Sequence, residues 1–133
     1  MLIQLDNKPV RMPEGIKFPI VKGALVAFIV DGGKIAQSNA VSIRRCRYSK
    51  AEKKIYITVE TSGSIYQDAP VSVRELPACS KDQIIETGQT LSDPNGNPII
   101  VSEILQITEV DGVVNVIFQN SNKDVYSTPF ILA

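Results

Sequence analysis

Residues 105–118, Leu-Gln-Ile-Thr-Glu-Val-Asp-Gly-Val-Val-Asn-Val-Ile-Phe, decide the fold class of this chain. Asp111-Gly112 lies between two segments of alternating apolar and polar residues, and an Asp-Gly pair in that position is a strong hairpin signal. A two-residue turn there pairs Val110 with Val113 and sets the register of everything upstream. The stretch therefore predicts two antiparallel strands.

The same register predicts a core face. It places Ile107 opposite Val116 and Leu105 opposite Phe118, so four apolar side chains share one side of the hairpin. Residues 98–106 taken alone also fit a helical period. The agreement between turn chemistry and core pattern favours the strand.

Downstream, a turn at 121–124 leads to a last strand, 125–132, in which Pro129 predicts an edge position. Upstream, residues 88–98 are dense in turn-forming residues and could separate two β-subdomains. Residues 77–82 are predicted to be a linker, and residues 70–76 to be a strand.

The first half contains two further predicted hairpins. Residues 16–22 and 24–30 form a strand pair, with Pro19 marking an edge or a bulge, followed by a tight turn at 31–34 and a short strand at 35–37. Residues 41–48 and 54–61 form the next pair. Alternation shifts parity within 41–48, which predicts a β-bulge near Arg44-Arg45.

These segments together predict an all-β fold, a small barrel or sandwich of short antiparallel strands. The chain has 133 residues, 44% of them apolar, which is enough for one domain with its own core. We expect a single domain over 1–133. A division into subdomains 1–77 and 88–133 is left open.

Histidine is absent, which removes the usual general base, the commonest metal ligand and the usual partner of a Ser or Cys nucleophile. Cys46 and Cys79 show neither a disulfide framework nor a metal-binding spacing. We expect two free thiols, with a single bridge between them as the alternative. We therefore expect no enzyme activity, no catalytic residues, no cofactor and no metal site.

Charge is unevenly distributed although the net charge is zero. Residues 1–80 carry twelve Lys and Arg against seven Asp and Glu, and residues 81–133 carry two against seven. One predicted hairpin contains much of the positive charge, and Glu52 is the only acidic residue among its basic residues. We predict that its basic residues bind a partner: Arg44, Arg45, Arg47, Lys50, Lys53 and Lys54.

Three interpretations of this basic cluster are open. Charged side chains can keep a hairpin arm from pairing with other strands. Arg and Lys on a β-ribbon can contact nucleic-acid phosphates, although few stacking aromatic residues lie nearby. The third is docking to an acidic protein patch, which would favour head-to-tail contacts between copies because the chain supplies such a patch itself. The residues of this acidic patch in the chain itself are Asp82, Glu86, Asp93, Glu103, Glu109 and Asp111.

In its short strands, its turns rich in Asn, Gly and Ser, and its lack of active-site residues, the chain resembles the small β-proteins of tailed-phage particles. The resemblance covers no motif and assigns no residue. It implies a non-enzymatic structural protein of a virion, such as a capsid decoration, head–tail or tail component, that acts through protein–protein contacts. The alternative is an SH3-like or OB-like β-barrel binding module that contacts nucleic acid or peptide through the basic hairpin.

We expect protein partners, either copies of this chain or neighbouring subunits, with nucleic acid as the second choice. No membrane contact is expected, because the most apolar window, 18–30, is interrupted by Lys22 and falls short of the ~20 residues of a membrane helix. The expected location is the virion, or alternatively the cytoplasm.

Overall fold

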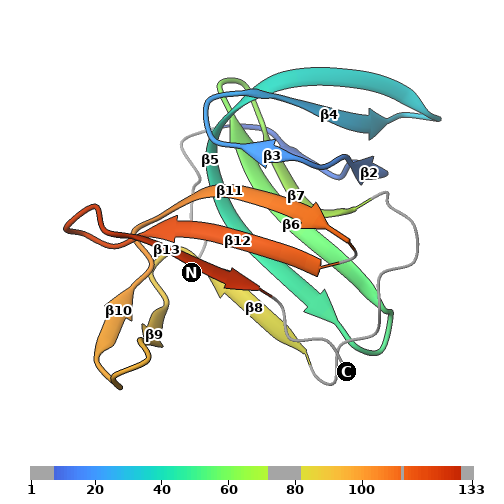
Figure 1. Cartoon of the computed structure of the whole chain (residues 1–133). Coiled ribbons are helices and arrows are strands. Elements are labelled where there is room, and N and C mark those ends of the chain that lie inside the picture. The colour runs from blue at the N-terminus through green and yellow to red at the C-terminus, as the bar shows by residue number, and fades with distance from the viewer. Residues whose placement is uncertain (1–7, 72–81, 112, 130–133) are drawn as a thin grey trace, which may run out of the picture.

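The computed structural model describes residues 8–71, 82–111 and 113–129. These residues form thirteen strands and no helix (Figure 1), which confirms the predicted all-β class. None of them belongs to a helix long and apolar enough to cross a membrane. The strands are β1 (Val10–Arg11), β2 (Gly15–Ile16), β3 (Ile20–Val21), β4 (Leu25–Val30), β5 (Lys34–Ser49), β6 (Lys54–Thr61), β7 (Ile65–Pro70), β8 (Gln83–Glu86), β9 (Thr90–Ser92), β10 (Pro98–Ile100), β11 (Glu103–Val110), β12 (Val113–Gln119) and β13 (Val125–Pro129).

The longest strand, β5, joins the parts of the fold. It runs for 16 residues and unites the strands predicted separately at 35–37 and 41–48. Its first half pairs with β4. Its second half pairs with β6 on one edge and with β8 and one residue of β11 on the other. The predicted break was wrong because pairing with β4 keeps the weak strand formers Ser38 and Asn39 extended.

Two register shifts interrupt the pairing of β5 with β6, and the second lies between Ile43 and Arg45. This is the β-bulge that the change of parity predicted near Arg44-Arg45, and it is confirmed. Ile43 and Cys46, three residues apart, are both buried. An unbroken strand would turn them to opposite faces, so the bulge is what brings both into the core.

The β11–β12 hairpin has the predicted register from its turn as far as Gln106. Beyond that point the prediction was wrong, because Phe118 pairs with Ile104 and not with Leu105. A register shift between Ile104 and Gln106 causes the difference. It turns Ile104 into the core, whereas Leu105 is only half-buried.

The strand predicted over 16–22 is divided in two. β2 pairs with β4, as expected for this hairpin, but β3 pairs with β11. Phe18 and Pro19 lie between the two short strands, and Pro19 has no N–H to give to a ladder. Because of this interruption, the predicted strand 16–22 forms two short strands that pair with different partners, β4 and β11.

The main sheet runs from β1 through β7, β6, β5, β11 and β12 to β13. Among the described residues, the backbone link between β2 and the end of β7 is a single bridge, Ile16 to Val71. The named strand pairs therefore leave the sheet open and do not close it into a barrel.

The sequence analysis did not predict β7, because Asp68 and Pro70 disfavour a strand. The strand predicted at 70–76 and the linker at 77–82 lie almost wholly outside the described residues.

The turn-rich segment 88–98 contains β9 and β10, which pair as a separate two-stranded sheet. Asp93 shapes its turn, since its Oδ1 accepts the N–H groups of Asn95 at 2.9 Å and Asn97 at 2.8 Å. β8 and β11, on either side of this segment, both pair with β5. Strands from both halves of the chain thus share one sheet, and the division into subdomains stays a prediction.

One buried core cluster takes residues from β2 and β4, from β5, β6 and β7, and from β11 and β12. The ring of Phe28 on β4 is fully buried and stacks on the ring of Tyr66 on β7, with centroids 3.8 Å apart. Beneath the C-terminal strands, Phe118 is buried and stacks on Tyr126 with centroids 5.5 Å apart. The contact between Phe28 and Tyr66 therefore joins segments that are distant in sequence, whereas Phe118 and Tyr126 are neighbours across the β12–β13 pair.

We expect Phe28→Ala to lower the free energy of unfolding by about 3–5 kcal/mol, because loss of a fully buried ring leaves a cavity beside Tyr66. Denaturant unfolding measures the change. Leu25→Ala on the same strand is the control, because Leu25 is 65% exposed and its truncation should cost no more than about 0.5 kcal/mol. Equal small effects at both positions would contradict this placement of the core.

Cys46 is a free cysteine, as predicted, and is fully buried, whereas Cys79 lies outside the described residues. Burial raises the pKa of the Cys46 thiol, so the reactive thiolate is scarce.

We expect Cys46 to resist alkylation by iodoacetamide in the native protein and to be alkylated once the protein is unfolded. Peptide mass spectrometry distinguishes it from Cys79. Rapid native labelling of Cys46 would show that the site is open to solvent.

Candidate functional site

The predicted basic cluster lies on the β5–β6 hairpin, but the fold divides it into three groups. Arg44 occupies the β-bulge of β5. Arg45 and Arg47 are paired across the ladder with Thr58 and Tyr56 of β6. The lysines lie exposed in or beside the turn, at Lys50, Lys53 and Lys54. The hairpin therefore brings the six residues to one arm without making them one surface.

Arg45 and Arg47 share a carboxylate from the next strand but one. Asp68 Oδ1 on β7 lies 2.8 Å from Arg45 Nη2 and 3.4 Å from Arg47 Nε. Asp68 has a φ of 47°, and its N–H donates to Thr58 Oγ1 at 3.1 Å. The Arg47 guanidinium also lies 4.3 Å from the centre of the Tyr56 ring. Asp68 and the Tyr56 ring therefore offset much of the positive charge of these two arginines within the protein.

Arg44 belongs to a second ion-pair group. Its guanidinium and the Lys8 ammonium both pair with the carboxylate of Glu60, whose residue is only 7% exposed. Lys8 also donates to the Thr61 carbonyl at 3.1 Å. The hydrogen bonds from Lys8 and Arg44 hold the pKa of Glu60 below its ordinary value, so this carboxylate is ionised at neutral pH.

The interpretation that Glu52 alone faces the basic cluster was wrong. Glu60 and Asp68 come from neighbouring strands, and nothing in the local sequence of the hairpin marks them as partners. Glu52 instead accepts a hydrogen bond from the Tyr56 hydroxyl. The ammonium groups of Lys50, Lys53 and Lys54 form no ion pair with any described residue. These three remain the part of the cluster available to a partner.

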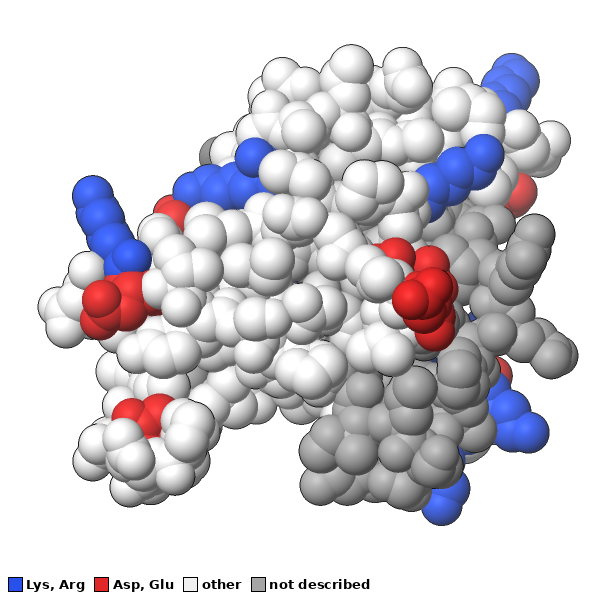
Figure 2. All heavy atoms as spheres, in the orientation of Figure 1, with Lys and Arg blue, Asp and Glu red and all other residues white. Residues whose placement is uncertain are grey.

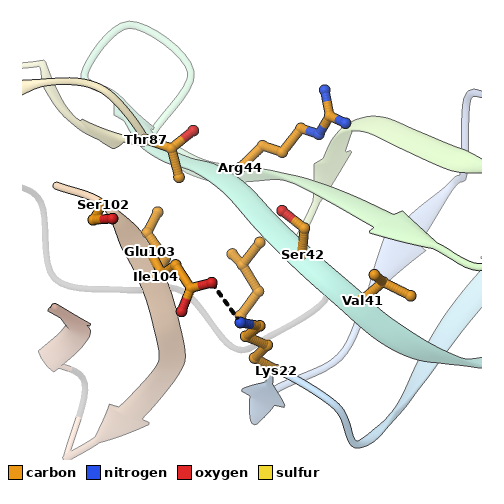
Figure 3. Close-up of a pocket in the computed structure, with 9 residues that line it drawn as sticks. Lys22, Val41, Ser42, Arg44, Thr87, Ser102, Glu103 and Ile104 are labelled. Carbon is orange, nitrogen blue, oxygen red and sulfur yellow. Dashed lines mark hydrogen bonds and ion pairs between the residues drawn. The ribbon is translucent and has the colours of Figure 1, made fainter. Parts of the chain in front are cut away.

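A hollow of about 300 Å³, lined by both polar and apolar side chains, lies where β5 and β11 diverge (Figure 3). Lys22 and Glu103 point toward one another across it, with Nζ 2.7 Å from Oε1. Gln119 Nε2 donates to the other oxygen of Glu103 at 2.7 Å. The ion pair with Lys22 lowers the pKa of Glu103, so this group accepts hydrogen bonds at neutral pH and does not supply a proton. Val41, Ser42, Ile43, Arg44, Thr87, Ser102 and Ile104 complete the lining.

Three of the six residues of the predicted acidic patch have partners within the described structure. Asp82 Oδ1 accepts the backbone N–H of Lys50 at 2.7 Å, within the basic turn itself. Asp93 accepts a hydrogen bond within its own turn, and Glu103 pairs with Lys22. Glu109 and Asp111 remain exposed beside the β11–β12 turn. No group of three or more metal-ligating side chains occurs among the described residues.

The outward side of β11, β12 and β13 forms a face without charge over most of its extent (Figure 2). Cross-strand partners share a side of the sheet, which places Gln106, Ile117 and Ser127 in one row. The next rows contain Thr108, Asn115 and Pro129, and then Val110 and Val113. We call these eight residues the uncharged face. Charged side chains lie beyond its two ends, the Lys22–Glu103 pair at one and Glu109 and Asp111 at the other.

Comparison of the chain with protein-family models, with curated proteins and with solved structures finds no match.

We expect Glu60→Gln to lower the free energy of unfolding by about 1–3 kcal/mol at neutral pH, because Lys8 and Arg44 lose their shared carboxylate. Since folding lowers the pKa of Glu60, its stabilisation is present above the ordinary glutamate range and is lost as pH falls through the folded pKa. The difference between wild type and variant should therefore shrink below about pH 4. Urea unfolding at a series of pH values measures it.

Glu103→Gln is the control, because that carboxylate is 42% exposed and its ion pair should contribute less than about 1 kcal/mol. A Glu60→Gln effect that does not change with pH would contradict the ion-pair assignment.

Proposed function

We propose that this chain is a structural subunit of a larger protein assembly and that it acts through protein–protein contacts. The uncharged face carries the proposal (Figure 2). Interface cores are depleted in charged residues, and charged groups collect at the rim. This face has that arrangement, with its charges beyond the ends of the strands.

Exposed apolar side chains support the same proposal. Val110, at one end of the uncharged face, is 63% exposed, and Val125 on β13, in the row just beyond its opposite end, is 61% exposed. Leu25 and Ile35 on the outer side of the β4–β5 hairpin are also exposed. Scattered apolar residues are ordinary on a protein surface, but these four lie on or beside sheet faces with few charges, which favours burial against a partner.

The finer proposal is a virion component of a tailed phage, such as a capsid decoration, head–tail or tail protein. Its support is the resemblance of the chain to the small β-proteins of such particles, in which short strands alternate with polar turns. An open sheet with an exposed edge strand suits that role, since neighbouring subunits can contact it along the strand as well as on its face.

One observation favours the second candidate, a binding module for nucleic acid or an acidic peptide. Lys50, Lys53 and Lys54 extend from the β5–β6 turn without an ion pair to any described residue. They can contact phosphates or carboxylates. Tyr56, the aromatic residue nearest to them on β6, already packs against Arg47, which leaves less of its ring for a nucleic-acid base.

Light scattering over a tenfold range of protein concentration, at low and high salt, tests the proposal. We expect a concentration-dependent rise in molar mass that persists in high salt, because the proposed contact surface is uncharged. The triple variant Lys50→Ser, Lys53→Ser, Lys54→Ser should associate as the wild type does.

A titration with a fluorescent single-stranded oligonucleotide tests the second candidate in the same buffers. A chain that stays monomeric, binds the oligonucleotide with an affinity that falls steeply with salt, and loses this binding in the triple-lysine variant would contradict the assembly proposal.

A further inference from the structure

β13 is the last strand at one end of the main sheet among the described residues. It pairs with β12 on one side and with no other described strand on its free side. Soluble proteins usually protect such edges with charged side chains, internal prolines or bulges. β13 has no charged residue, pairs with β12 over its five residues without a register shift, and has its proline only at the last position. Another strand can therefore extend the sheet at this edge.

The hydrogen-bonding pattern shows which backbone groups of β13 point away from β12. In the turn before it, Asn120 N–H donates to the Asp124 carbonyl at 3.0 Å. Hydrogen-bonded and non-hydrogen-bonded pairs alternate along an antiparallel ladder, so Tyr126 and Thr128 direct their backbone groups toward β12. The residues that direct theirs outward are Val125, Ser127 and Pro129.

This outward pattern is complementary to itself. If two copies pair antiparallel about a two-fold axis at Ser127, each Ser127 N–H donates to the Ser127 carbonyl of the other copy. Each Val125 N–H then donates to the carbonyl of Pro129 in the other copy. Pro129 has no N–H, so every outward donor of the strand is used. The strands overlap over their whole length, and the contact is closed by its symmetry.

The opposite end of the main sheet is a poorer partner for β13. β1 contains only two residues, and it lies between Pro9 and Pro13, neither of which has an N–H. Head-to-tail pairing of β13 with β1 of a second copy would leave part of β13 without partners. The pairing of β13 with itself leaves none of its outward N–H groups free.

We propose that the partner of the β13 edge is a second copy of this chain, bound antiparallel with Ser127 on the two-fold axis. The β11, β12 and β13 strands of both copies then form one continuous sheet, and the two uncharged faces become one surface. This inference rests on the proposed function of assembly through protein contacts and names the first of those contacts.

Sedimentation velocity over a wide concentration range tests the pairing with two substitutions at one position. Ser127→Pro removes the outward N–H and places the proline ring in the contact. Ser127→Ala is the matched control, since it loses the same hydroxyl bond to Asn115 Oδ1, 2.9 Å long, but keeps the N–H. We expect Ser127→Pro to weaken dimerisation by roughly tenfold to a hundredfold and Ser127→Ala to leave it within about threefold.

Ser127→Lys keeps the N–H and tests the register independently, should the proline variant fail to fold. It places like charges directly opposite one another across the axis, which destabilises a strand pair. We expect the dimer of this variant to weaken at low salt and to recover at high salt as the charges are screened. Circular dichroism confirms that each variant retains the fold of the wild type.

Each remaining outcome overturns the pairing. If the wild type associates and Ser127→Pro does so equally, the β13 edge is not the contact, and the proposed function stands on another surface. If Ser127→Ala weakens the dimer as much as Ser127→Pro, the hydroxyl and not the edge N–H is responsible. If the wild type is monomeric at every concentration, β13 does not pair with itself, and the oligonucleotide titration decides the proposed function separately.

Discussion

β5 pairs with other strands along both of its edges, and this pairing holds the sheet together. β4, β6, β8 and β11 all attach to this strand directly, and β7 and β12 attach through them. A strand held on both sides cannot slip by one residue without moving its core side chains to the solvent side. The bulge at Arg44 thus sets which residues of β5 enter the core and which face outward.

The same bulge determines how the charge of the hairpin is used. It turns Ile43 and Cys46 inward and leaves Arg45 and Arg47 on the outer side, within reach of Asp68. Arg44, at the bulge itself, pairs with Glu60 instead. Because these arginines are largely paired within the molecule, the hairpin presents less free positive charge than its sequence indicates, and a partner meets chiefly the lysines of the turn.

The surface that remains for a partner is therefore mostly uncharged. The outward side of β11, β12 and β13 has exposed apolar and amide side chains, and it ends at an edge strand that is regular and without charge. A contact along the edge and a contact on the face are compatible, since strand pairing lies in the plane of the sheet and leaves its face accessible. A dimer formed through β13 would present a larger face to further subunits.

Sequence patterns predict the all-β class, the β11–β12 turn, the β5–β6 hairpin and the bulge near Arg44, because turn chemistry and alternation are patterns of a few neighbouring residues. Three further features arise only in the folded chain: Ile104 replaces Leu105 opposite Phe118, Glu60 and Asp68 pair with the arginines, and β3 leaves its hairpin for β11. These features depend on which strands become neighbours across the sheet. Local periodicity predicts which side chains share a face, but it does not predict which distant strand lies beside them.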